Sequence, residues 1–189
     1  VTKAGSGTLI LSGVNTYTGV TTIDAGTLSV STIGNGGVAG NLGAASSAAA
    51  NLVFAGGTLE YTGATASTNR NFTLNAGTNV IDITNVATVL TMSGASTATG
   101  NGFNKDGAGT LIISGANLHT GTTTVNLGVL QYGANNALAN GAVTVNDGAT
   151  YDLNGFSDAI GSLTVNSGAT GGTVTTGAGI LTLGGNVSS

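Results

Sequence analysis

Two stretches of this 189-residue chain carry nearly the same sequence. Residues 3–30 read KAGSGTLILSGVNTYTGVTTIDAGTLSV, residues 105–132 read KDGAGTLIISGANLHTGTTTVNLGVLQY, and 15 of the 28 aligned positions are identical. A third, truncated copy within residues 177–189 begins GAGILTLGGNV. Repetition over tens of residues is typical of folds that stack similar units along one axis. We therefore interpret residues 1–189 as a single segment excised from a longer repeat array.

The copies are unequally spaced, with 102 residues from Lys3 to Lys105 but only 70 from Gly107 to Gly177. Each unit must therefore contain several structural turns, and the first unit carries extra material. The extra residues are expected in 31–50, which are rich in glycine, alanine and serine and so predict a loop or insertion.

Short runs of β-branched residues and leucine, each bounded by glycine or asparagine, predict many short strands. No segment shows the i, i+3, i+4, i+7 apolar stripe of a helix, so essentially no helix is expected. The predicted strands are 8–11, 20–23, 27–30, 51–54, 58–61, 72–74, 80–83, 89–92, 110–113, 122–125, 129–132, 142–145, 151–153, 162–165, 173–175 and 180–183.

Comparison of the copies predicts which side chains are buried. Leu181 and Leu183 flank Thr182 in the third copy, and side chains alternate across a strand. The matching positions Ile10 and Ile112 should therefore face outward. The side chains expected inside are Leu9, Leu11, Ile23, Leu28, Val30, Leu111, Ile113, Val125, Leu130 and Tyr132.

Three short strands joined by tight turns, recurring every 20-odd residues, predict an all-β fold, a right-handed parallel β-helix of about eight or nine coils. The chain has no proline, as expected where nearly every strand N–H bonds to a neighbouring coil. Asn15, Asn117 and Asn186 are assigned to one repeat position, where stacked asparagines can form a ladder. The competing fold is an antiparallel β-sandwich, which normally has longer strands and hairpin turns.

Composition excludes several classes of partner and site. Three basic residues against seven acidic ones, with a net charge of −4, argue against binding to nucleic acid or an anionic membrane. The apolar runs are too short for insertion into a bilayer. With no cysteine, the chain has no disulfide framework and no thiolate metal site.

The pattern G-x-G-T-L-x-L-x-G-x-N-x-Y-x-G-x-T-x-[IV]-x-x-G-x-L resembles the autotransporter-associated β-strand repeat, also called the passenger-associated transport repeat. His119 replaces the tyrosine in the second copy. The matching residues, expected to be structural, are Gly5, Gly7, Thr8, Leu9, Leu11, Gly13, Asn15, Tyr17, Gly19, Thr21, Ile23, Gly26, Leu28, Gly107, Gly109, Thr110, Leu111, Gly115, Asn117, Gly121, Thr123, Val125, Gly128 and Leu130.

The resemblance implies an extracellular structural stalk, part of a passenger domain exported through the outer membrane to the bacterial cell surface. It also implies that the repeats assist export, because each coil that folds outside buries its leucines on the previous coil. The expected partners are neighbouring repeats of the parent chain. End-to-end self-association into a fibre and an adhesive role toward a glycan, host or matrix ligand, with loop 31–50 carrying specificity, remain alternatives.

No residue is expected to be catalytic, and no cofactor is implied. His119 is the only histidine and has no acidic or cysteine neighbour, so we interpret it as a solvent-facing variant of the repeat. Asp147, Asp152 and Asp158 form the densest acidic group, but they lack a calcium-loop pattern, and turn residues are the better interpretation. Lys3 and Lys105 are repeat equivalents and suggest a scaffold position, and Arg70 is expected in a turn.

Overall fold

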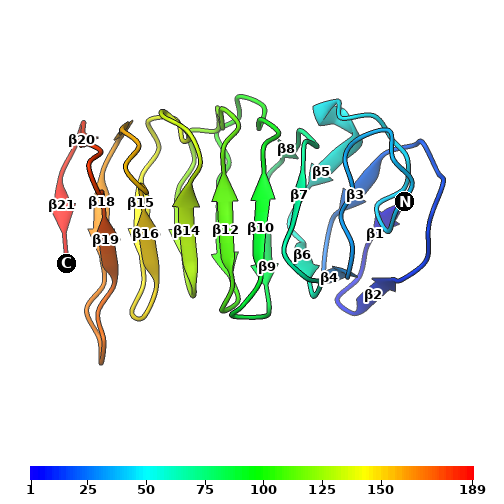
Figure 1. Cartoon of the computed structure of the whole chain (residues 1–189), viewed down its shortest axis with the longest axis horizontal. Helices are drawn as coiled ribbons and strands as arrows, with labels where there is room; N and C mark the ends of the chain where they lie inside the picture. The colour runs from blue at the N-terminus through cyan, green and yellow to red at the C-terminus, as the bar shows by residue number, and fades with distance from the viewer.

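The computed structural model describes residues 1–189, which wind into a rod of about nine stacked coils. Figure 1 shows the coils following one another along the long axis, with the two termini at opposite ends. Three faces run along the rod, and a complete coil contributes in turn to the bridged face, the nine-stranded face and the six-stranded face defined below.

The nine-stranded face receives one strand from every coil. In spatial order its strands are β2 (Thr8–Leu11), β4 (Thr27–Val30), β6 (Thr58–Tyr61), β9 (Val80–Ile83), β11 (Phe103–Asp106), β13 (Thr123–Val125), β15 (Val143–Val145), β18 (Leu163–Val165) and β21 (Val187–Ser188).

The six-stranded face begins in the third coil. Its strands are β7 (Ala66–Thr68), β10 (Val89–Met92), β12 (Thr110–Ile113), β14 (Val129–Tyr132), β16 (Thr150–Asp152) and β19 (Thr173–Thr175).

The bridged face is the least regular of the three. It starts as a four-stranded sheet of β1 (Thr2–Lys3), β3 (Thr21–Ile23), β5 (Leu52–Phe54) and β8 (Thr73–Leu74), and it ends with the pair β17 (Asp158–Ile160) and β20 (Leu181–Leu183). Single parallel bridges join these parts through Phe72, Ser96, Asn117 and Leu138. The backbone N–H of Asn136 then donates to the carbonyl of Ser157 at 2.9 Å, which continues the ladder.

Every pairing between strands is parallel and joins one coil to the next. The predicted parallel β-helix is therefore confirmed, and the antiparallel sandwich is excluded. The helical content is one short 3₁₀ turn, η1 (Ala49–Asn51). The structure contains no helix with the length and apolar character of a membrane span.

The expected strands all appear, some with an end moved by a residue, but five further strands were not predicted. These are β1, β7, β11, β17 and β21. They escape a search for apolar alternation because several inward positions are polar: Lys105 on β11, Thr68 on β7 and Asp158 on β17 are all buried.

A cluster of 30 buried residues fills the bore of the rod. Leu28, Leu111 and Leu130 are fully buried, as predicted for their repeat positions. Leu9 and Leu11 also face the core, but they are only half-buried because they lie in the first coil. Ile10 between them is 69% exposed, which confirms the predicted alternation.

The three sequence copies lie on three different faces. The equivalent strand is β2 on the nine-stranded face in the first copy, β12 on the six-stranded face in the second and β20 on the bridged face in the third. Each copy of the repeat therefore begins one face later, in chain order around the coil, than the copy before it. The repeat therefore specifies a corner and its flanking strands rather than a fixed side of the rod.

Residues 31–50 form a loop between β4 and β5, as predicted, where later coils place a strand of the six-stranded face. The loop is packed, because Ile33 and Leu42 are buried in the core. It also bonds to the edge strand β7 and the residue after it, with Thr68 Oγ1 donating to Gly34 O and Gly36 N donating to Asn69 Oδ1, both at 2.9 Å. The loop thus covers the free edge of the six-stranded face.

Candidate functional site: buried caps at the repeat corners

Each full copy of the repeat begins with a buried lysine that caps a corner. Lys105 lies in an inward column of the nine-stranded face between Ile81 and Val125. Its Nζ donates to the carbonyls of Asp106 at 2.7 Å and Gly107 at 2.8 Å, and to Leu127 O in the next coil at 3.1 Å. Burial lowers the pKa of Lys105 to about 8. The ammonium group therefore fastens one corner to the corner of the following coil.

Lys3 repeats this arrangement at the first copy. Its Nζ donates to Ala4 O at 3.1 Å, Gly5 O at 2.7 Å and, one coil on, Ala25 O at 2.9 Å. The third copy has Thr175 at the equivalent position and so has no lysine cap. The structure is consistent with the scaffold role that repeat equivalence suggests for the two lysines.

We predict that Lys105→Met lowers the free energy of unfolding by about 2 kcal/mol, because three corner carbonyls lose a charged donor while methionine fills the same apolar column. Lys3→Met is the matched control. It removes the same three bonds from the first coil, where local fraying costs the remaining coils little. Urea unfolding of both variants measures the difference. Equal shifts in the two midpoints would contradict an interior cap.

A second cap is an asparagine shared by both copies. Asn117 Nδ2 donates to Gly115 O at 3.0 Å and to Ala137 O in the next coil at 2.9 Å. Asn15 Nδ2 likewise donates to Gly13 O at 3.3 Å and to Asn41 O at 3.0 Å. The two side chains are four coils apart, so they do not stack on one another in the predicted ladder.

The third cap is an aromatic ring bonded to the threonine four residues later. Tyr17 Oη and Thr21 Oγ1 are 2.9 Å apart, and His119 Nε2 and Thr123 Oγ1 are 3.0 Å apart. His119 Nδ1 also lies 3.2 Å from Ser96 Oγ, and its ring packs edge-on against Phe103. The interpretation of His119 as solvent-facing is wrong, because the imidazole is only 2% exposed. Histidine can take the place of tyrosine here because each ring bonds to the hydroxyl of the threonine four residues later, Thr123 for His119 and Thr21 for Tyr17.

Burial lowers the pKa of His119 to about 4. Between pH 6.5 and 4 the unfolded chain binds a proton that the folded chain does not, so acidification favours unfolding. We predict a loss of up to about 3 kcal/mol from this group as the pH falls to 4. His119→Tyr, the residue of the other copy, should remove this component. Urea midpoints across that pH range test it, and parallel curves for the two proteins would contradict it.

The repeat glycines allow neighbouring coils to approach closely. A Cβ added at Gly115 would lie 2.3 Å from Gly94 O, and one at Gly109 would lie 2.5 Å from Asn85 O. The equivalent Gly13 and Gly7 have no atom within 4 Å of such a Cβ, because their coil has no coil before it in the structure. A packed preceding coil therefore excludes a side chain at these positions.

The other repeat positions fall into a few groups. Gly26 and Gly128 both adopt a positive φ, +64° and +66°. A Cβ added at Gly26 would lie 2.4 Å from the carbonyl oxygen of Gly7, and one added at Gly128 would lie 2.4 Å from that of Gly109. Thr8 is exposed and Thr110 half-buried at the start of a strand. The remaining glycines all lie in turns or connections between strands: Gly5, Gly19, Gly107 and Gly121.

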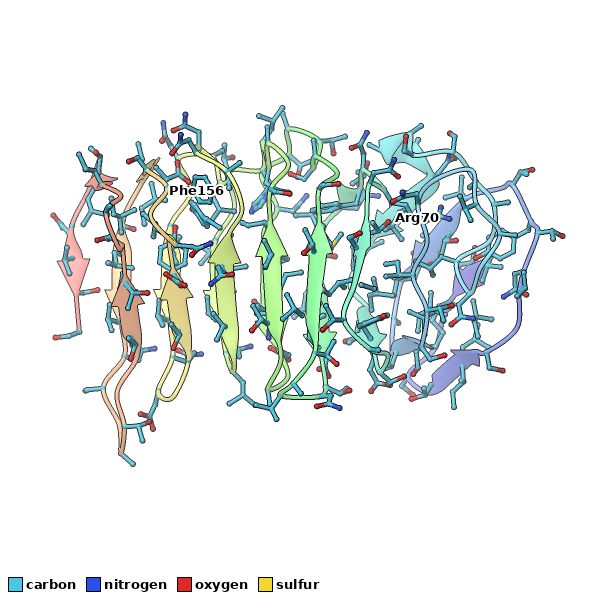
Figure 2. The ribbon with its side chains drawn as sticks, viewed as in Figure 1. Arg70 and Phe156 are labelled. Carbon is cyan, nitrogen blue, oxygen red and sulfur yellow. The ribbon has the colours of Figure 1, made fainter.

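Arg70 is a cap that sequence reasoning missed. It lies in the connection between β7 and β8, where a turn was expected, but its side chain is only 2% exposed and lies beside loop 31–50 (Figure 2). The guanidinium donates to carbonyls of that loop, with Nε to Gly34 O at 3.0 Å, Nη1 to Ala45 O at 3.1 Å and Nη2 to Gly43 O at 2.7 Å. Longer bonds reach Asn35 O and Val38 O. Burial lowers its pKa.

The three aspartates do not converge on one site. Asp147 is exposed and accepts from the backbone N–H groups of Ala169, Thr170 and Gly171, which lowers its pKa. Asp152 accepts from Gln131 Nε2. Asp158 is buried and accepts from the N–H of Leu138 at 3.0 Å. No three histidine or carboxylate side chains are grouped so that they could hold a metal ion.

An asparagine ladder does exist, but on the nine-stranded face. Asn146 Nδ2 donates to Asn126 Oδ1 at 2.7 Å, Asn166 Nδ2 donates to Asn146 Oδ1 at 2.6 Å, and Asn126 Nδ2 donates to Asp106 Oδ1 at 2.6 Å. The signal for it is the triplet Thr-Val-Asn, which recurs every 20 residues at 124–126, 144–146 and 164–166. That period is one coil.

Comparisons with known proteins agree with the repeat. The family model of the passenger-associated-transport-repeat matches residues 1–30 and 103–131. The Adhesin BmaC autotransporter of Brucella suis biovar 1 (strain 1330) is 51% identical over 125 residues, which cover 66% of this chain and 4% of that protein. The chain thus spans a small part of the length of this relative. No solved structure matches the chain.

The matched residues contain the lysine, asparagine and aromatic caps described above. The repeat unit, the stacked coils and the relative all agree with the resemblance found in the sequence, and its implied location is the bacterial cell surface. The chain is a passenger repeat segment of the autotransporter type.

Proposed function

We propose that this segment is a structural, non-enzymatic part of an extracellular stalk and that its repeats assist folding and export of the passenger. The observation that carries the proposal is the set of caps that bond one coil to the next. Lys105 bonds to a carbonyl 22 residues on, and Asn117 bonds to one 20 residues on. A newly formed coil is thus fastened to its neighbour by buried polar bonds as well as by its apolar side chains.

This arrangement suits a chain that emerges through a membrane in an extended form. Each coil that closes outside becomes costly to reopen, because reopening breaks the caps and exposes the inward column. Folding on the outer side therefore opposes movement back through the membrane. The absence of cysteine is compatible with this route, since no disulfide can close a loop before export.

The test is surface display of the full-length parent protein carrying Lys105→Met, Asn117→Ala and His119→Ala together. The matched control alters three exposed side chains of the same unit: Leu118→Thr, Thr120→Ser and Leu127→Thr. We expect the cap variant to reduce the passenger reached by extracellular protease several-fold and the control to leave it unchanged. Deletion of units 3–30 and 105–132 is the stronger perturbation. Undiminished display in both the cap variant and the deletion would refute the proposal.

Adhesion is the second candidate function, and the order of loop 31–50 favours it. Arg70 and the contacts with β7 hold the loop in one conformation, with Val38 54% exposed on its outer side. The relative is named an adhesin. Val38→Asp alters this outer side and leaves the buried side chains in place. A screen against glycans and matrix proteins should then show weaker binding for the variant, and equal binding would exclude the loop as the adhesive surface.

A further inference from the structure

A hollow of about 340 Å³ lies at the edge where the bridged face meets the nine-stranded face. Glycines at 77, 100, 102 and 121 form part of its wall, so backbone rather than bulky side chains bounds it on that side. The polar side chains around it are Thr78, Asn79, Asn101, Asn104, Thr122 and Thr124.

Two of these side chains are fixed by the protein itself. The buried amide of Asn79 accepts from Gly56 N at 3.0 Å and donates to Asn75 O and Gly102 O at 2.9 and 3.1 Å. Asn101 Nδ2 donates to Leu74 O at 3.1 Å. These bonds hold the wall of the hollow in place before any ligand arrives, which lowers the ordering cost of binding.

The other four side chains are free to bind a ligand. Thr78, Asn104, Thr122 and Thr124 make no side-chain hydrogen bond within the protein, and Thr78 and Thr122 are exposed. Each hydroxyl can both donate and accept, and an amide offers both functions as well. The hollow therefore presents donors and acceptors together, as a polyhydroxylated ligand requires.

The polar surface continues from the hollow along the rod. Asn104 and Thr124 are register partners on β11 and β13, and the column extends through Thr144 on β15 and Thr164 on β18, where the Thr164 hydroxyl also bonds to Ser188 Oγ at 2.9 Å. Neighbouring strands are about 4.8 Å apart, so the column offers hydroxyl groups at a regular spacing. The asparagine ladder that starts at Asp106 runs beside it and keeps the adjacent amides aligned. A linear ligand can thus leave the hollow and lie parallel to the rod.

The charges on this face restrict the class of ligand. No ionisable side chain lines the hollow. Glu60, Asp82 and Asp106 follow one another in register on β6, β9 and β11 of the same face. Burial and the neighbouring carboxylates of Glu60 and Asp106 raise the pKa of Asp82, and the buried Lys105 ammonium group offsets part of this effect. Three carboxylates and one ammonium group thus lie at this end of the face, so its net charge is negative. An anionic polymer would be repelled there, whereas an uncharged one would not.

We propose that the hollow and the hydroxyl column form a binding site for an uncharged, linear polysaccharide that lies along the rod axis. Recognition uses hydrogen bonds rather than aromatic stacking, because Phe103, the one apolar side chain at the hollow, is only 2% exposed. Phe156, which Figure 2 shows near the turn between β16 and β17, is not among the lining residues. The site goes beyond the stalk function and does not depend on it.

The test measures binding of the full chain to mannan, dextran and hydroxyethyl cellulose, with heparin and alginate as anionic counterparts. The site variant carries Thr124→Val, Thr144→Val and Thr164→Val, which remove three hydroxyls and keep the shape and strand preference of the side chains. The control carries Thr110→Val, Thr150→Val and Thr173→Val, three threonines of one column on the six-stranded face.

We expect at least one neutral polysaccharide to bind, with at least tenfold weaker binding to the site variant and unchanged binding to the control. Thermal unfolding of both variants separates a loss of binding from a loss of fold. The proposal is overturned if none of the neutral polysaccharides binds, if the anionic ones bind better, or if both variants weaken binding equally. Surface display of the site variant should stay normal. A loss of polysaccharide binding can therefore be distinguished from a failure of the proposed export role.

Discussion

Replacement of Gly115 by alanine is expected to lower the free energy of unfolding by roughly 2–4 kcal/mol, whereas replacement of Gly13 is expected to change it by less than about 0.5 kcal/mol. The two glycines occupy the same position of the repeat. At Gly115 the new Cβ would lie 2.3 Å from the carbonyl oxygen of Gly94, and the next nearest atoms are also backbone. The backbone of one coil must therefore move away from the other, and that movement weakens the parallel ladders on both sides.

Neither glycine requires a backbone conformation that alanine avoids, since neither has a positive φ. The comparison thus isolates the space between coils from conformational strain. Urea unfolding monitored by circular dichroism gives the two midpoints, and hydrogen exchange locates the damage, which should centre on the coils that contain Gly94 and Gly115. If Gly13→Ala were as harmful as Gly115→Ala, close approach of coils would not be the reason for glycine.

Replacement of Arg70 by methionine is expected to cost about 3 kcal/mol or more and to release loop 31–50. Hydrogen bonds to a charged donor contribute more than neutral ones, and the guanidinium serves carbonyls of five loop residues. The gain from no longer burying a charge offsets part of this loss. Because the loop covers the edge strand β7, its release also exposes unpaired N–H and C=O groups of that strand, which can pair with a strand of another molecule.

Arg70→Lys is an informative companion, because lysine keeps the charge but its single ammonium group cannot span the same carbonyls. It should recover less than half of the lost stability. Asn69→Ala is the mild control, since it removes one bond from Gly36 N at an exposed position and should cost about 1 kcal/mol or less. Limited proteolysis reports the loop directly. A loop that stays resistant to protease in Arg70→Met would contradict its role as the anchor.

The positions of most strands were predictable from the sequence, because alternation of leucine, valine and threonine indicates which side chains face inward; β1, β7, β11, β17 and β21 were missed. Leu111 and Ile113 illustrate this, since the third copy alone was enough to assign their face. Stacking into a solenoid was predictable because the repeat is too short to bury its own apolar side chains. The loop 31–50 followed from its composition and from the unequal spacing of the copies.

The polar interior was not predictable by the same rule. Lys105, Arg70 and His119 are buried, yet their residue types usually mark the surface. Lys105 is held by backbone carbonyls at a coil corner, Arg70 by carbonyls of loop 31–50, and His119 by the hydroxyls of Ser96 and Thr123. These partners come together only after the coils have stacked. The pattern of a single strand does not indicate that a polar side chain will find a hydrogen-bond partner 22 or more residues away. The asparagine ladder lies outside this polar interior, since its side chains are half-buried or exposed, and the 20-residue period of its Thr-Val-Asn triplets is visible in the sequence.

The placement of the three copies on three successive faces has a mechanical consequence. If every unit began on the same face, the tight glycine corners would line up along one edge of the rod and leave the other edges without them. Here the corner that follows β1, the one that follows β11 and the one that follows β19 lie at three different edges. The two corners that a buried lysine fastens, after β1 and β11, thus lie at different edges, so the caps resist separation of the coils along more than one edge of the rod.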